Sequence, residues 1–265
     1  MRLLSIVICI AFFSLITPAF AELDVDVIVD GLNNPWEIVF GPEGEIFFTE
    51  RDGRIWKIEN FEEAKVIETF PKSGSMEGGT LGLALHPDFK NNQKIYIYQT
   101  NLELEFFQNK VFSFTVDGDA LTDKQVVIDD IPGAPWHDGG RIAFGPDGKL
   151  YITTGDAINP GWSQDLSSLA GKILRINSDG TIPDDNPFDS SPIFSYGHRN
   201  PQGIAWSDDG LFVSSEHGPS GEMGHGHDEI NVIVKGKNYG WPKVVGDSSD
   251  DSFVNPIIHS GQSTW

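Results

Sequence analysis

A histidine set among an acid, two glycines and an arginine is the stretch of this sequence best suited to chemistry. It is His137, within the run from Trp136 to Arg141, which leads directly into an apolar segment at 142–152. Glycine allows positive φ angles and close approach to a ligand, and histidine titrates nearest to neutral pH. The stretch therefore fits a general base at the mouth of a strand. A hydrogen-bonded histidine that caps the strand end is the structural alternative.

The first 21 residues have the features of a secretory signal peptide. Arg2 precedes an apolar run from Leu3 to Ile16, and small residues at Ala19 and Ala21 indicate cleavage ahead of residue 22. We therefore expect a mature domain at 22–265 that is secreted or periplasmic, with no membrane span after cleavage. An uncleaved anchor is the alternative, although the apolar run is short for a span.

The charge and the cysteine count narrow the class of partner. The formal net charge is −21, which argues against nucleic acids and anionic membranes as partners. Excess carboxylates also suit divalent cations, although solubility alone accounts for most of them. The single cysteine, Cys9, lies in the signal segment. A mature chain without it has no disulfide and depends on its core, on metals or on closure of the fold.

One hairpin pattern recurs four times and predicts the elements that position His137. Each copy has an apolar strand, a turn with Pro, Asp or Gly, and a second β-branched or aromatic strand. The copies begin near positions 40, 85, 144 and 206. A further strand signal follows each copy, at Arg54–Ile58, Lys110–Phe114, Lys172–Ile176 and Glu229–Ile233. Repeats of this length with several strands each predict the blades of a β-propeller, with a β-sandwich as the alternative.

The chain stops at Trp265 without a completed fifth copy of the pattern. Propellers close as rings, because an open ring leaves strand edges exposed. We therefore expect an all-β propeller domain at 22–265 that is incomplete, with about four blades present and the C-terminal part truncated. A complete four-bladed ring is the alternative.

Six motifs that occur in order carry a family resemblance. They are GGTLGLALHPDF at 78–89, HDGGR at 137–141, LSSLAGKILRI at 166–176, YGHRNPQG at 196–203, EHGP at 216–219 and KNYGWP at 237–242. Together they resemble the soluble glucose/sorbosone dehydrogenase family, and within it the aldose sugar dehydrogenases that use pyrroloquinoline quinone (PQQ). The resemblance spans about Leu32 to Pro242. Each motif alone is weak, whereas six in order are specific.

The resemblance implies a six-bladed propeller with PQQ lying across its top near the axis, about two blades more than the repeats show. It implies oxidation of aldose sugars at the anomeric carbon to lactones, with hydride transfer to the quinone. Electrons would pass to a quinone or a small redox carrier, and a homodimer is compatible with the family. In such proteins the later blades add basic residues that hold the cofactor's carboxylates, and this chain has no counterpart of them.

The resemblance also assigns roles to residues. His137 becomes the general base for the hydroxyl proton, and Arg199 stabilises charge that arrives on the quinone. Asn200 contacts the quinone oxygens, and Glu77 falls where the family has a polar residue near the cofactor. Taken alone, Arg199 fits a surface ion pair and Glu77 a solvated loop acid. Trp136 stands where sugar-selective relatives have an acid, which favours stacking on a sugar ring and a broad substrate range.

Two calcium ions are implied in the same way. One lies against the quinone on the backbone carbonyls of Gly218 and Pro219, as suits a hard cation that prefers oxygen ligands. The other, structural ion takes Glu229, the Tyr239 carbonyl and an acid within 247–250. Ordinary loop acids are the alternative for this second set.

The segment 223–228 is longer than in the family and contains His225 and His227. Two imidazoles beside acids suit zinc or copper. The glycines in this segment favour a different prediction, a mobile loop that covers the entrance to the cofactor site.

Two other functions stay open at this point. A propeller of this fold can bind sugars or proteins without catalysis, because fold alone does not establish activity. A calcium-dependent lactone hydrolase is also a propeller, but it needs acidic and amide side chains on its calcium rather than carbonyls beside a histidine and an arginine.

Overall fold

A computed structural model describes residues 25–220 and 224–264 of the chain. The chain divides into two units, Met1–Asp30 and Gly31–Trp265. The described part of the first unit, residues 25–30, contains no helix or strand. The predicted signal peptide lies outside the described residues. Among the residues described, none of the helices has the length and apolar character needed to cross a membrane.

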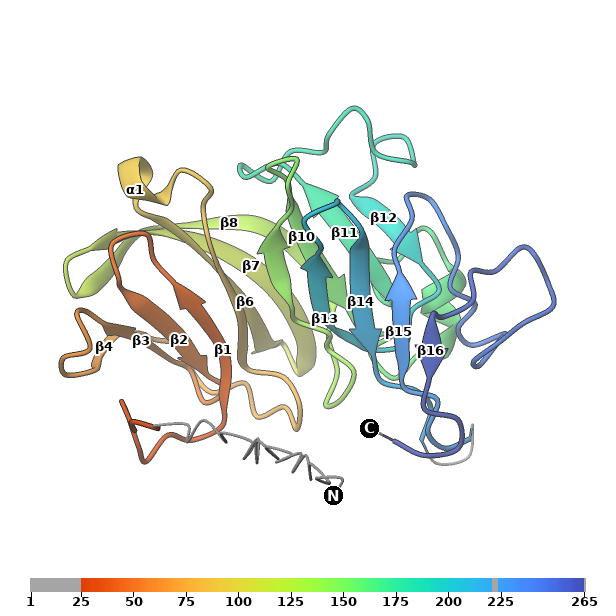
Figure 1. Ribbon diagram of the computed structural model, residues 1–265, viewed down its shortest axis with the longest axis horizontal. Coiled ribbons are helices and arrows are strands. Elements are labelled where there is room, and N and C mark those ends of the chain that lie inside the picture. The colour runs from red at the N-terminus through yellow and green to blue at the C-terminus, as the bar shows by residue number, and fades with distance from the viewer. Residues whose placement is uncertain (1–24, 221–223, 265) are drawn as a thin grey trace, which may run out of the picture. The chain divides into compact units, whose positions relative to one another are not determined.

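The second unit is built from four antiparallel sheets of four strands each (Figure 1). Consecutive strands are neighbours within every sheet, as in the blades of a propeller. The strands are β1 (Pro35–Phe40), β2 (Ile46–Glu50), β3 (Arg54–Ile58) and β4 (Lys65–Thr69) in blade 1, β5 (Thr80–Leu85), β6 (Lys94–Glu103), β7 (Phe106–Asp117) and β8 (Ala120–Pro132) in blade 2, β9 (Ile142–Phe144), β10 (Leu150–Thr154), β11 (Lys172–Ile176) and β12 (Ile193–Tyr196) in blade 3, and β13 (Pro201–Trp206), β14 (Phe212–Glu216), β15 (Glu229–Val232) and β16 (Ile258–His259) in blade 4.

The predicted repeats correspond to these blades. The four hairpins are the first two strands of each blade, and β3 and β11 have the bounds of their strand signals. Helical structure within the described residues is limited to α1 (Phe89–Asn92) and the 3₁₀ turn η1 (Pro160–Gln164). The all-β propeller class is therefore confirmed, and the β-sandwich alternative is wrong. The number of blades beyond four stays a prediction.

Apolar side chains from both faces of the sheets form three cores between successive blades. Strand β6 contributes side chains to two of these cores. Ile95 and Ile97 pack toward blade 1, whereas Tyr96 and Tyr98, which alternate with them, pack toward blade 3. Side chains two apart share a face of a strand, so a strand buried on both faces is apolar throughout. Each fully buried aliphatic side chain of this kind stabilises the fold by about 1.5–3 kcal/mol.

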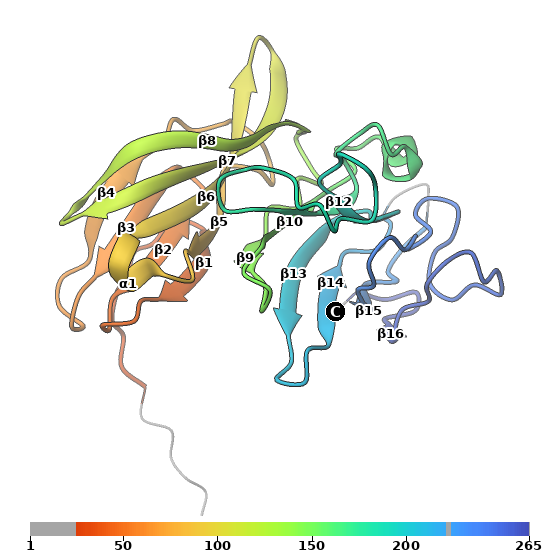
Figure 2. The ribbon, with the colours of Figure 1, turned by 90° about the horizontal axis from the view of Figure 1, so that it is seen from above.

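The blades follow one another in chain order, as the view in Figure 2 shows, with blade 3 between blade 2 and blade 4. The first strand of each blade lies innermost, and β5 packs against both β1 and β9. Arg141, just ahead of β9, ties three blades together: it pairs with Glu37 of β1, donates to the Gln202 carbonyl of β13 at 2.9 Å and lies over the Trp36 ring at 4.1 Å.

Antiparallel pairing within a blade brings the start of the first strand to the same sheet edge as the end of the second. Residues just before β5, β9 and β13 therefore gather with residues at the ends of β10 and β14. This edge carries every predicted catalytic residue.

Candidate functional site

A row of three side chains from three segments forms the centre of the site. The His137 ring lies between Asp156, whose Oδ1 is 2.8 Å from Nδ1, and Arg199, whose Nη2 is 2.8 Å from Nε2. His137 precedes β9, Asp156 follows β10 and Arg199 precedes β13. Asp156 is fully buried, whereas 17% of the His137 side chain is exposed. The histidine is thus the most exposed member of the row.

The two partners of His137 determine its tautomer when the ring is neutral. An ionised carboxylate only accepts hydrogen bonds, so Nδ1 must carry the proton that faces Asp156. A guanidinium only donates, so Nε2 must offer its lone pair to Arg199. The geometry therefore holds an imidazole whose nitrogen remote from Asp156 is the basic one, which is the arrangement that a general base needs.

The backbone at His137 is held in a conformation that a side chain seldom adopts. Its φ is 64°, in the left-handed region. The Glu77 carboxylate accepts the His137 N–H at 2.9 Å, and the Ala157 N–H donates to the His137 carbonyl at 3.2 Å. A Cβ at Gly155 would come within 1.9 Å of that carbonyl, so only glycine fits there. Strained residues of this kind concentrate at functional sites.

The guanidinium of Arg199 is a buried cation with neutral partners. It donates to the His217 carbonyl at 3.3 Å, to Ser220 Oγ at 3.2 Å and to His137. No carboxylate of residues 25–220 or 224–264 forms an ion pair with it. Burial lowers the pKa of Arg199, and four nearby carboxylates, at Asp156, Glu216, Glu77 and Asp228, oppose that shift. Its charge is thus free to interact with a ligand.

Glu77 and Asn200 lie beside the row, as predicted. The Asn200 amide donates to Glu77 at 3.3 Å, and its oxygen accepts the Gly139 N–H at 3.0 Å. These contacts bring Glu77, His137, Arg199 and Asn200 into one group. His198 lies apart from it, fully buried between Ser195 at 2.8 Å and Glu216 at 2.9 Å.

Asp138 supports the loop on which Glu77 lies. Its carboxylate accepts from the Ala134 N–H and the Asn109 amide, both at 3.1 Å, and from the Ser75 hydroxyl at 3.3 Å. The Ser75 hydroxyl in turn accepts the Gly78 N–H at 2.8 Å. Burial is the main cause that raises the pKa of Asp138 to about 6.

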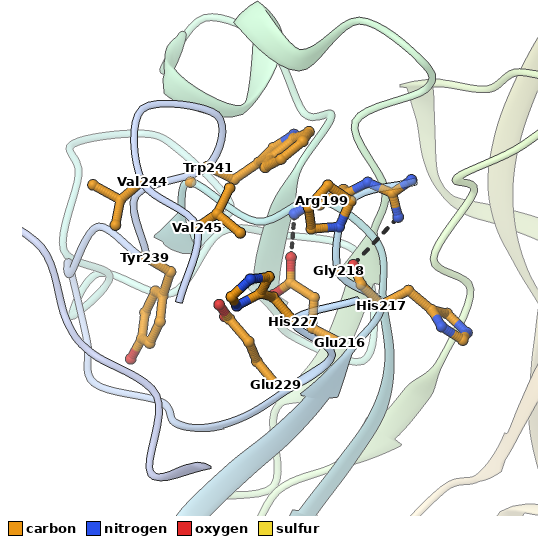
Figure 3. A pocket seen from close by; sticks show the side chains of 12 residues that line it. Arg199, Glu216, His217, Gly218, His227, Glu229, Tyr239, Trp241, Val244 and Val245 are labelled. Carbon is orange, nitrogen blue, oxygen red and sulfur yellow. Dashed lines mark hydrogen bonds between the residues drawn. The ribbon is translucent and has the colours of Figure 1, made fainter. Parts of the chain in front are cut away.

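A small cavity lies next to Arg199 on the side of blade 4 (Figure 3). Its volume is about 20 Å³, which is enough for one water molecule or ion. Gly218 and Pro219, predicted to hold one calcium ion, and Glu229 and Tyr239, predicted to hold the other, all line this cavity. Burial raises the pKa of Glu229, and the neighbouring Glu216 adds to the shift because like charges disfavour ionisation. A cation in this cavity would relieve both effects.

The acids at 247–250 divide between two environments. Asp247 lies 3.5 Å from His259 and close enough to Glu229 to act on its charge. Asp250 instead accepts from the N–H and hydroxyl of Ser252 in a local turn. Of the two, Asp247 is the acid placed near Glu229.

The His225–His227 segment forms no multidentate metal cluster. His227 stacks on His259 with ring centroids 5.0 Å apart, and their Nδ1 atoms lie 3.2 Å apart. Nowhere in 25–220 or 224–264 do three or more His, Cys, Asp or Glu side chains group to hold a metal ion. Zinc or copper binding by this segment therefore has no support, and residue 223 lies outside the described ranges.

Two residues of the site were missed from the sequence, Asp156 and Trp241. Trp241 donates its indole N–H to Asp156 Oδ2 at 2.8 Å. Asp156 follows the second strand of blade 3 in the run Thr154-Gly155-Asp156, which resembles an ordinary loop acid. A signal was present, because Glu50 and Glu216 also stand at the ends of the second strands of their blades.

The fold and site together define a propeller with a histidine between a buried carboxylate and a buried arginine, and that arginine forms no ion pair with a carboxylate of the described residues. The chain belongs to the glucose/sorbosone dehydrogenase family, which matches residues 32–260. The predicted family is thus confirmed.

Individual relatives agree with the family. The chain is 36% identical to quinoprotein glucose dehydrogenase B of Acinetobacter calcoaceticus, over 88% of this chain and 55% of that protein. It is 34% identical to an aldose sugar dehydrogenase of Escherichia coli, over 89% of this chain and 65% of that one. The chain therefore spans less than two thirds of either relative.

Among solved structures, the chain is similar to the PQQ-bound form of an aldose sugar dehydrogenase from Streptomyces coelicolor. The TM-score is 0.81 with 37% identity, and the match covers 89% of this chain and 70% of that chain. The four blades described above thus have the arrangement of a sugar dehydrogenase propeller.

Because the pKa of Asp138 is raised in the folded chain, the free energy of unfolding should depend on pH. The folded chain holds this proton more tightly than the unfolded chain, whose Asp pKa is near 3.8, so unfolding becomes easier as the pH rises toward 6. Asp138→Asn removes this titration while it keeps an acceptor for Ala134 and Asn109 and a donor for Ser75. A shift from 3.8 to about 6 corresponds to about 3 kcal/mol.

We therefore expect the free energy of unfolding of Asp138→Asn, relative to the native chain, to rise by up to about 3 kcal/mol between pH 4 and pH 7. Urea denaturation across this range measures the difference. A difference that does not change with pH would show that the Asp138 carboxyl is not perturbed by burial.

Proposed function

We propose that this protein is an oxidoreductase that uses PQQ and calcium to oxidise aldose sugars at the anomeric carbon to lactones. The observation that carries the proposal is the Arg199 guanidinium, which is buried, lacks an ion-pair partner among the described residues and points at the basic nitrogen of His137. An arginine in this state suits an electron-rich oxygen of a ligand beside the base. The relatives named above support the same chemistry.

The residues present fit a quinone cofactor. Arg199 and the Asn200 amide offer donors to quinone oxygens, and Glu77 anchors both Asn200 and the backbone of His137. When bound, PQQ supplies the acceptor for the hydride from the sugar. The guanidinium is always charged and rigidly planar, so its position relative to that acceptor is better fixed than a lysine ammonium would be.

His137 acts as the general base. Its Nε2 takes the proton of the anomeric hydroxyl, and Nδ1 keeps its own proton on Asp156 throughout. The carboxylate of Asp156 stabilises the imidazolium that forms, as in other histidine–carboxylate pairs. For this to occur, Arg199 must release the Nε2 lone pair when a sugar enters, and it has acceptors at His217 and Ser220 that can hold it.

Calcium fits the ligands that the chain offers. Because the described residues contain no cluster of three ligating side chains, a metal here needs backbone or cofactor oxygens, which the Gly218 and Pro219 carbonyls supply. Four carboxylates surround the single arginine, so a divalent cation would also offset the negative charge that an anionic cofactor adds. A second calcium would take Glu229, the Tyr239 carbonyl and Asp247.

Trp136 supports a broad range of sugars. Its side chain is 44% exposed beside His137, and the exposed indole offers a flat apolar surface rather than a hydrogen-bonding group. We infer a small quinone or redox carrier as electron acceptor, a periplasmic or secreted location, and compatibility with a homodimer.

Replacing the base tests the reaction. His137→Ala should lower kcat for aldose-dependent dye reduction by a factor of at least about 10² to 10⁴, the usual contribution of general-base catalysis. PQQ binding, followed by the change in tryptophan fluorescence, should change little because Arg199, Asn200 and the carbonyls remain.

His86→Asn is the matched control. His86 follows the far end of β5, whereas Glu77 precedes its near end, so this substitution should leave kcat unchanged. Full turnover by His137→Ala would remove the histidine from the mechanism. PQQ bound with no dye reduction by any aldose would contradict the enzyme and leave a binding propeller.

The predicted calcium site can be tested separately from turnover. A Cβ at Gly218 would come within 2.0 Å of the Gly226 carbonyl, so Gly218→Ala must displace the backbone whose carbonyls would hold the ion. At Gly161, a Cβ would meet nothing closer than 3.5 Å.

In chelator-treated protein we expect PQQ binding to require added calcium. Gly218→Ala should raise the calcium concentration needed by at least about tenfold, a change of about 1.4 kcal/mol, whereas Gly161→Ala should not. Titration calorimetry measures both. Tight PQQ binding in the presence of excess chelator would contradict the calcium assignment.

A further inference from the structure

The indole of Trp241 connects blade 4 to the acid that orients the base in blade 3. Its Nε1–H donates to Asp156 Oδ2 at 2.8 Å, and the ring lies 5.6 Å from the Arg199 guanidinium carbon. Trp241 therefore contacts Asp156 and Arg199. No hydrogen bond between Trp241 and His137 is found among the described residues.

The buried carboxylate of Asp156 needs the indole N–H as a hydrogen-bond donor, because it is fully buried and has few other donors. Oδ1 accepts from His137 and from the Ile158 N–H at 2.9 Å, whereas Trp241 is the donor found for Oδ2 among the described residues. A buried carboxylate oxygen that loses its donor costs more than an ordinary hydrogen bond contributes.

The backbone of Trp241 is held on both sides, which fixes the point from which the indole projects. Its N–H donates to the Gly197 carbonyl at 2.9 Å, and its carbonyl accepts from the Gln164 amide at 2.7 Å. Only 6% of the residue is exposed. The indole is therefore a buried ring on a fixed backbone, with its N–H directed at Asp156.

Charged groups face His137 from every neighbouring segment. Asp156 lies at Nδ1, Arg199 at Nε2, Glu77 at the backbone N–H, and Asp138 is next in the chain. Trp241 acts on the first of these. A donor to Oδ2 stabilises the negative charge of Asp156 and weakens its pull on a second proton at His137, so the imidazole is held in its neutral form.

We propose that Trp241 is a positioning residue for the base, acting through its indole N–H on Asp156 to keep His137 deprotonated and its Nδ1–H directed at the carboxylate. The catalytic meaning of this role rests on the proposed function, in which His137 is the base. The positioning itself is a property of the protein without cofactor.

The test separates the indole N–H from the bulk of the ring. Replacing Trp241 by 3-benzothienylalanine, in which sulfur stands for the N–H, preserves the shape and removes the donor; Trp241→Phe is the simpler second variant. Trp206 stacks on Phe212 at 4.4 Å within blade 4, away from the row, so the same two replacements there are controls.

Titration of ¹⁵N-labelled histidine by NMR in the cofactor-free protein is the first measurement. The His137 signals in the benzothienyl protein should change protonation state at a pH higher by about 1 unit, which corresponds to a tenfold change in proton affinity. The controls at Trp206 should leave the His137 titration unchanged. An unchanged titration in the folded benzothienyl protein would overturn the proposal, whatever the enzyme does.

Turnover supplies the second measurement. The acidic limb of kcat/KM should move to higher pH in both Trp241 variants, with kcat at pH 6 lowered about tenfold and KM little changed. An equal loss of kcat at all pH values, with no displacement of the limb, would indicate packing alone and overturn the positioning role. A shifted NMR titration without any turnover would support Trp241 and contradict only the proposed function.

Discussion

The site depends on burying one guanidinium that forms no ion pair with a carboxylate of residues 25–220 or 224–264. Removing an ion of this kind from water costs several kcal/mol, and most proteins offset the cost with an ion pair. Here Arg199 is bound by a carbonyl, a hydroxyl and the lone pair of His137, with carboxylates close enough to moderate its charge but not to pair with it. The positive charge of Arg199 is therefore already in place for an electron-rich atom of a ligand. A charge fixed in advance in this way lowers the activation barrier, because the site need not reorganise during the reaction.

Much of the structure serves to keep that row in place. Glu216 accepts the Arg199 backbone N–H and binds His198, so one buried acid fixes both the arginine backbone and the residue before it. Gly155 allows the segment that carries Asp156 to pass against the His137 carbonyl. Blade 3 contributes His137 and Asp156 to the row and blade 4 contributes Arg199, and the core between these two blades holds their relative positions.

The sequence predicted the fold well because the propeller repeats itself. Strand β6 alternates side chains between two cores, and the same pattern recurs in each hairpin, so four copies could be recognised without any long-range information. The outermost strands β4, β8, β12 and β16 were not singled out. Their outer edges are solvated and need no apolar repeat, and β16 has only two residues.

The candidate site was predicted in part. Motif order indicated His137, Arg199, Asn200 and Glu77, and the structure brings them together. Asp156 and Trp241 were missed, because their importance arises from a hydrogen bond between residues 85 positions apart. Neither local spacing nor periodicity carries that information. The roles of all these residues remain proposals until turnover is measured.

The central claim is that this site oxidises an aldose with a bound quinone. Anaerobic mixing of the protein, loaded with one equivalent of PQQ and with calcium, against an aldose in the absence of any electron acceptor tests it most directly. We expect the quinone absorption to convert to that of the reduced cofactor in a single turnover, with one equivalent of lactone formed. Bound PQQ that stays oxidised with every aldose tried would contradict the proposed function.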